Sequence, residues 1–79
     1  MLDHKENIHG YLVYYDDEAK LGIEHLAHVL SFDEARSMFL AAHRTLDKID
    51  FEDRLGRNFV LIGRMDGNFE LYARKEGWF

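Results

Sequence analysis

Two stretches decide the fold: Ile8-His-Gly-Tyr-Leu-Val-Tyr-Tyr15 and Asn58-Phe-Val-Leu-Ile-Gly-Arg-Met65. Both are rich in the β-branched and aromatic residues that favour strands, and neither alternates cleanly between apolar and polar positions. A strand of an antiparallel sheet with one face in water should alternate in this way. We therefore expect two strands that are covered on both faces.

A helix follows the sequence Ser31-Phe-Asp-Glu34, which is a capping box. In this motif the Ser31 hydroxyl accepts a hydrogen bond from the N–H of Glu34, and the Glu34 carboxylate accepts one from the N–H of Ser31. The apolar residues that come next recur at helical spacing, at Ala35, Met38, Phe39, Ala42 and Leu46. We predict a helix over about residues 32–48 that packs this stripe on a sheet.

Asp66-Gly67 lies between two strand-like runs and predicts a tight hairpin turn. In a two-residue turn Ile62 faces Leu71, and Phe59, Leu61 and Tyr72 share the opposite face. In a three-residue loop with a bulge at Gly67, Leu61 faces Leu71, and Val60, Ile62 and Tyr72 share the opposite face. The sequence does not choose between these registers, but both place Tyr72 on the same side.

Residues 21–30 fit two patterns. Ile23, Leu26 and Leu30 fit a helical stripe, whereas Leu21, Ile23 and Val29 fit a strand, and Gly22 weakens a helix. We favour the strand, because residues 16–20 then form a hairpin loop. The predicted fold is a single α+β domain over residues 1–79: an antiparallel sheet of about four strands with one amphipathic helix on one face, in the order β-β-α-β-β, after a loosely packed N-terminus at 1–7. The helical alternative would leave two adjacent helices, broken at Ser31, that cover more of the sheet.

One helix, about 10 Å across, covers only one side of a four-stranded sheet whose strands are spaced about 4.8 Å apart. The other face then needs a cover, which we expect to be a protein partner or a second copy of the chain. Its centre should be Tyr72, with Phe59 and Leu61 beside it in the first hairpin register or Val60 and Ile62 in the second.

The formal charge of −5 is uneven along the chain. The predicted order brings the 16–20 loop and the 49–57 connection to one end of the domain, where acidic side chains form a rim that suits a partner with a basic surface. The residues of this rim are Asp16, Asp17, Glu18, Asp47, Asp50, Glu52 and Asp53. An acidic balance argues against nucleic acid, which needs a basic footprint.

No pattern of catalytic, cofactor or metal-binding residues is recognisable. There is no cysteine, and His25 and His28 would lie on opposite faces of the predicted strand. We expect no enzyme activity, no cofactor and no metal. The charged start of the chain and the lack of a long apolar run predict a cytoplasmic protein without a membrane span.

A short, acidic chain without motifs has the profile of inhibitors carried by phages and mobile elements, such as anti-CRISPR proteins, antitoxins and immunity proteins. This is an analogy of composition. It leads us to expect a protein-interaction module that inhibits or antagonises its partner. The first alternative is a structural homodimer. The second is a module that binds single-stranded nucleic acid through the last hairpin, where Arg57, Arg64, Arg74 and Lys75 accompany Phe59 and Tyr72.

Overall fold

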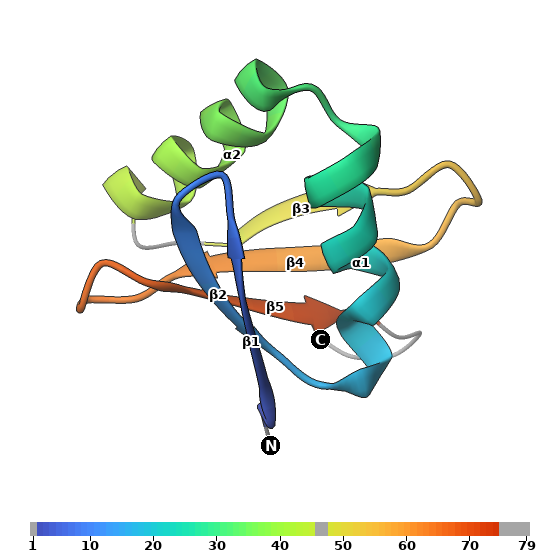
Figure 1. The fold of residues 1–79 in the computed structure, drawn as a ribbon, viewed down its shortest axis with the longest axis horizontal. Coiled ribbons are helices and arrows are strands. Elements are labelled where there is room, and N and C mark those ends of the chain that lie inside the picture. Colours follow the sequence, from blue (N-terminus) through green and yellow to red (C-terminus); the bar gives the residue numbers. More distant parts are fainter. Residues whose placement is uncertain (1, 46–47, 75–79) are drawn as a thin grey trace.

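The computed structural model describes residues 2–45 and 48–74, which form one five-stranded sheet with helices on one of its faces (Figure 1). The strands are β1 (His4–Ile8), β2 (Tyr11–Tyr15), β3 (Lys48–Glu52), β4 (Asn58–Gly63) and β5 (Phe69–Ala73). The helical segments are η1 (Asp17–Ala19), α1 (Lys20–Glu24), the π-helical η2 (His25–Val29) and α2 (Phe32–Thr45).

The sheet has the strand order β1-β2-β5-β4-β3, so the last strand in sequence lies at its centre. β2 pairs with β5 in parallel, through Val13 opposite Phe69 and Tyr15 opposite Leu71. All other neighbouring strands are antiparallel. In Figure 1 the β1–β2 hairpin crosses the direction of β4 and β5, which shows that the sheet is strongly twisted.

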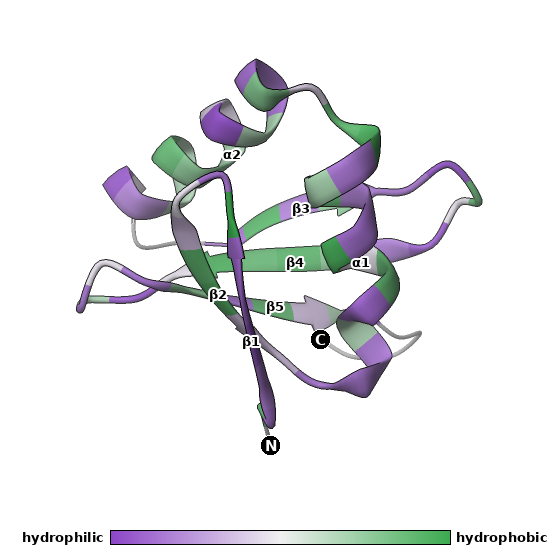
Figure 2. Cartoon of the chain, in the orientation of Figure 1, coloured by the Kyte–Doolittle hydropathy of each residue, from purple (hydrophilic) through white to green (hydrophobic). Residues whose placement is uncertain are grey.

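The α+β class is confirmed, but the four-stranded antiparallel sheet is wrong in both strand count and pairing. Ile8 to Tyr15 is a hairpin rather than one strand, because His9 and Gly10 turn the chain with φ of 54° and 93°. Two consecutive positive φ angles are typical of a two-residue hairpin turn, and histidine tolerates this region better than most residues. Residues 4–7, predicted to be loose, form most of the edge strand β1, which Figure 2 shows to be hydrophilic.

The strand predicted for residues 21–30 is also wrong, because η1, α1 and η2 form one continuous helical run there. Gly22 lets this run lie close to the sheet: a Cβ at its position would be 2.7 Å from Cδ1 of Phe59 and 3.0 Å from Cδ2 of Leu71. The residue that argued against a helix is therefore the one that allows the helix to pack.

The capping box at the start of α2 is confirmed. The N–H of Ser31 donates to Oε1 of Glu34 at 2.8 Å, and the N–H of Glu34 donates to Oγ of Ser31 at 3.1 Å. Hydrogen bonding of the Glu34 carboxylate to Ser31, first to its backbone N–H and then to its side chain, holds the pKa of Glu34 below its ordinary value. The described part of the helix ends at Thr45, β3 begins at Lys48, and Leu46 and Asp47 lie outside the described residues.

The β4–β5 hairpin has the second of the two registers considered. Leu61 lies opposite Leu71 and Phe59 opposite Ala73, and Gly67 has φ of 90° in a three-residue loop closed by the N–H of Arg64 on the carbonyl of Asn68. This register turns Phe59 and Leu61 toward the helices. They are 2% and 0% exposed, in a core with Phe39, which stacks on Tyr11 at 4.6 Å. None of the described helices is long and apolar enough to cross a membrane.

Candidate protein-interaction surface

The loop between β3 and β4 is held in one shape by the carboxylate of Asp53. Its Oδ1 accepts hydrogen bonds from the backbone N–H of Leu55 at 3.0 Å and of Arg57 at 2.9 Å, and its Oδ2 accepts one from Nε of Arg57 at 2.7 Å. Backbone bonds close the same loop, from Asp53 to Arg57 and from Gly56 to Asp53. With its side chain only 5% exposed, Asp53 is a structural residue of the loop.

The electrostatics of Asp53 agree with this role. Desolvation alone raises the pKa of the Asp53 carboxyl, but the hydrogen bonds from Arg57 and Leu55 and the positive charge of Arg57 outweigh it. The pKa therefore lies below its ordinary value, and the loop keeps an ionised carboxylate at neutral pH.

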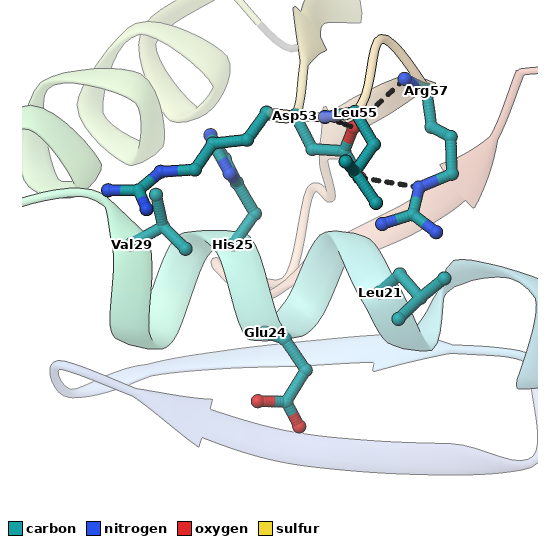
Figure 3. Close-up of a pocket in the computed structure, with 8 residues that line it drawn as sticks. Leu21, Glu24, His25, Val29, Asp53, Leu55 and Arg57 are labelled. Carbon is teal, nitrogen blue, oxygen red and sulfur yellow. Dashed lines mark hydrogen bonds and ion pairs between the residues drawn. The ribbon is translucent and has the colours of Figure 1, made fainter.

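Leu55 lies at the tip of this loop with 76% of its surface exposed. Together with the helical run, the loop lines an open, mostly apolar hollow of about 270 Å³. Figure 3 shows Leu55 and Arg57 above the helix that carries Leu21, His25 and Val29. We call this hollow the Leu55 groove; its lining residues are Leu21, Glu24, His25, Val29, Asp53, Arg54, Leu55 and Arg57.

The helical wall of the groove includes the π-helical turn of η2. His25 is buried there, with its ring stacked on Phe51 at a centroid distance of 5.7 Å, and it forms part of the groove lining. His28 is exposed beside Glu24, so the two histidines are not paired for a metal. Within residues 2–45 and 48–74 no three His, Asp or Glu side chains are grouped to hold a metal ion.

A second hollow, of about 300 Å³, continues the groove toward the end of β5. It shares Leu21 and Arg57 with the first, and Ala73 and Arg74 lie in its lining. Among the described residues, six large apolar side chains are exposed, and three of them line the Leu55 groove: Leu21, Val29 and Leu55. Half of the exposed large apolar side chains of the described residues thus lie together at the groove, and none of the six belongs to a strand.

The sheet face opposite the helices carries Tyr72, as predicted, together with Tyr14 and Ile62. Tyr72 is half-buried and donates a hydrogen bond to Oε1 of Glu70 at 2.6 Å, while Arg64 lies over the Tyr14 ring at 4.6 Å. Burial first, and then the bond to and charge of Glu70, raise the pKa of Tyr72 to about 12. This face combines internally bonded polar groups with apolar ones, because Val60, which pairs with Tyr72, is buried and Ile62 is half-buried. Phe59 and Leu61, the alternative neighbours of Tyr72, are in the core.

Several carboxylates of the predicted acidic rim are bound within the chain. Asp53 is bound to Arg57, and Asp50 forms an ion pair with Arg74 at 2.6 Å. Asp17 contacts His4, Asp16 caps η1 through the N–H of Ala19, Glu52 is exposed on β3, and Asp47 lies outside the described residues. The predicted proximity holds for Glu18, which shares the second hollow with Gly56 and Asn58.

Sequence reasoning missed Leu21, Val29 and Leu55 as surface residues. The available signal was a lone leucine inside the short loop Asp53-Arg-Leu-Gly56, where a turn would expose it. No protein-family model matches the chain, and no curated protein and no solved structure shows significant similarity to it.

Proposed function

We propose that this chain is a small, non-enzymatic protein-interaction module that binds its partner through the Leu55 groove and inhibits or antagonises it by occupying that partner. The observation that carries the proposal is the exposed side chain of Leu55, held by the Asp53 loop beside Leu21 and Val29. An apolar cluster of this kind is costly to leave in water and is typical of interaction sites.

The rigidity of the loop supports the same proposal. Binding loses less free energy when the contacting residues are already ordered, and the bonds to Asp53 fix the backbone on both sides of Leu55. A shallow, mostly apolar groove with charged groups at its edge suits the anchoring side chain of a protein. Occupying a partner requires only such a shaped patch, which a chain of 79 residues can provide.

Nucleic acid fits this surface less well. Phe59, expected to stack bases, is in the core, and Arg64 and Arg74 are paired with Glu70 and Asp50. Cations that are already neutralised contribute less to phosphate binding.

The test is a pull-down from cells of the organism that encodes the chain, with wild-type protein and two variants. Leu55→Asp places a charge in the groove, and Met65→Asp is the matched control, because Met65 is 93% exposed in the corresponding loop of the other hairpin. We expect a partner that the wild type and Met65→Asp retain and that Leu55→Asp loses, with equal melting temperatures. A partner retained equally by all three proteins contradicts the proposal.

A structural homodimer through the sheet face is the alternative, favoured by the half-buried Tyr14, Ile62 and Tyr72 on that face. Light scattering distinguishes the two. A monomer supports the groove as the binding surface, whereas a dimer that persists in Leu55→Asp favours the sheet face.

A further inference from the structure

We infer that the Leu55 groove binds an internal, extended segment of a partner protein in which an aliphatic side chain stands next to an aspartate or glutamate. This inference rests on the proposed function and adds the chemistry of the partner. Its basis is the arrangement of arginines beside the apolar lining of the groove.

Arg57 presents a guanidinium that is only partly used. Its Nε donates to Oδ2 of Asp53, which fixes the plane of the group, and its side chain is 43% exposed. Figure 3 shows the terminal nitrogens on the side away from this bond, directed toward the helical wall near Leu21. An oriented guanidinium with free terminal N–H groups is suited to binding a carboxylate through two hydrogen bonds.

Arg54 adds a second positive charge to the same wall. It is exposed and lines the hollow, and it forms no ion pair within the described residues. Asp53, the carboxylate nearest in sequence, is buried and bound to Arg57. The loop therefore carries one more positive than negative charge directly beside Leu55.

Two carboxylates lie on the helical wall: Glu18 lines the second hollow with Arg57, and Glu24 lines the first. Glu24 belongs to the lining, but Figure 3 shows its carboxylate directed away from the β3–β4 loop, and it lies 3.7 Å from His28. In the first hollow a partner carboxylate thus meets the positive charges of Arg54 and Arg57, although the whole chain carries −5. An aliphatic neighbour of that carboxylate would contact Leu55 and Leu21.

The shape of the groove favours the middle of a chain over its end. The two hollows of about 270 and 300 Å³ share Leu21 and Arg57, and their other lining residues differ. A polypeptide can pass along such a groove, whereas a closed pocket would be expected for a terminal carboxylate.

A library of random dodecapeptides displayed on phage, with a fixed C-terminal fusion, tests the inference on the immobilised full chain. We expect the wild type to select peptides with Leu, Ile, Val or Met next to Asp or Glu. Leu55→Ser should lose the selection. Arg54→Glu should keep the aliphatic preference and lose the acidic one, and Arg36→Glu, an exposed charge reversal on α2, should select as the wild type does.

Fluorescence anisotropy with a selected peptide measures how much each substitution weakens peptide binding. A charge reversal beside a bound carboxylate should weaken binding at least about fivefold for Arg54→Glu and leave Arg36→Glu unchanged. Selected peptides that are basic or neutral but still depend on Leu55 overturn the acidic chemistry and leave the groove proposal intact. Selection that does not depend on Leu55, or no selection by the wild type, overturns both.

Discussion

Asp53 fixes the geometry of the groove, because one carboxylate satisfies two backbone N–H groups and orients Arg57. The pKa of Asp53 is lower in the folded state than in the unfolded chain, where it is about 3.9. The ionised carboxylate therefore stabilises the folded state at any pH above about 3.9. This stabilisation is lost as the pH falls through the folded-state pKa. The loop that presents Leu55 should therefore be weakest in acid.

Replacing Asp53 with Asn tests this dependence. At pH 7 we expect a lower urea midpoint for two reasons. The amide carries no charge to pair with Arg57. If its oxygen accepts the hydrogen bonds from the N–H groups of Leu55 and Arg57, its NH₂ group faces Nε of Arg57, which is also a donor. Below about pH 4 the difference from wild type should shrink, since the Asp53 carboxyl of the unfolded chain then takes up a proton and, at lower pH, that of the folded state does too. Asp50→Asn is the control: Asp50 is exposed, and its surface ion pair with Arg74 should contribute little. Equal midpoints for Asp53→Asn and wild type at pH 7 would show that the loop does not depend on this charge.

A glycine lies at the contact between the sheet and each of the two helical segments. Gly22 brings α1 against Phe59 and Leu71, and Gly63 in β4 lies directly under α2. A Cβ at Gly63 would be 2.3 Å from the backbone oxygen of Ala42, an atom that cannot move without moving the helix. These two contacts set the distance between the helices and the sheet.

Gly63→Ala should therefore destabilise the fold by about 1–3 kcal/mol, the usual cost of overpacking, measured by urea unfolding. Gly22→Ala should cost less than the clash alone suggests, because alanine favours a helix over glycine by about 1 kcal/mol. A Gly63→Ala variant as stable as wild type would mean that α2 does not lie at this distance from β4.

At the scale of elements, the sequence predicts the helix start and the hairpin turn, whose signals lie within a few neighbouring residues. The Ser31–Glu34 box and the turn at Asp66-Gly67 are local signals, and both are confirmed. The strand predicted for residues 21–30 is wrong because the reason for Gly22 lies in Phe59 and Leu71, far away in sequence. The π-helical turn also disturbs the regular helical spacing of residues 25–29.

The candidate site was harder to predict than the fold. Tyr72 was placed on the correct face, but which residues accompany it depends on a register that the turn sequence left open. The Leu55 groove forms only when the helical run packs beside the β3–β4 loop, and its walls are about 30 residues apart in sequence. A pattern of neighbouring residues therefore does not reveal that these two segments lie side by side.

At the scale of the whole molecule, the chain closes its sheet with its last strand. β5 lies between β2 and β4, and its Phe69 and Leu71 are buried against residues from both ends of the chain. β1, in contrast, is a mostly exposed edge strand whose only buried side chain is Ile8. The cooperativity of folding should therefore depend on β5 far more than on β1.

Two truncated chains test this difference by thermal unfolding followed with circular dichroism. A chain of residues 1–66 lacks β5 and leaves Val13 and Leu61 without their partners Phe69 and Leu71, so we expect no cooperative transition. A chain of residues 8–79 loses most of β1 but keeps Ile8, and it should unfold cooperatively at a lower temperature. The β1–β2 hairpin contributes few buried side chains outside β2, whereas removing the central strand divides the sheet into two separate parts. A cooperative transition in the 1–66 chain would show that the helices and β3–β4 fold without β5, and that the parallel β2–β5 pair is not what unites the two halves of the molecule.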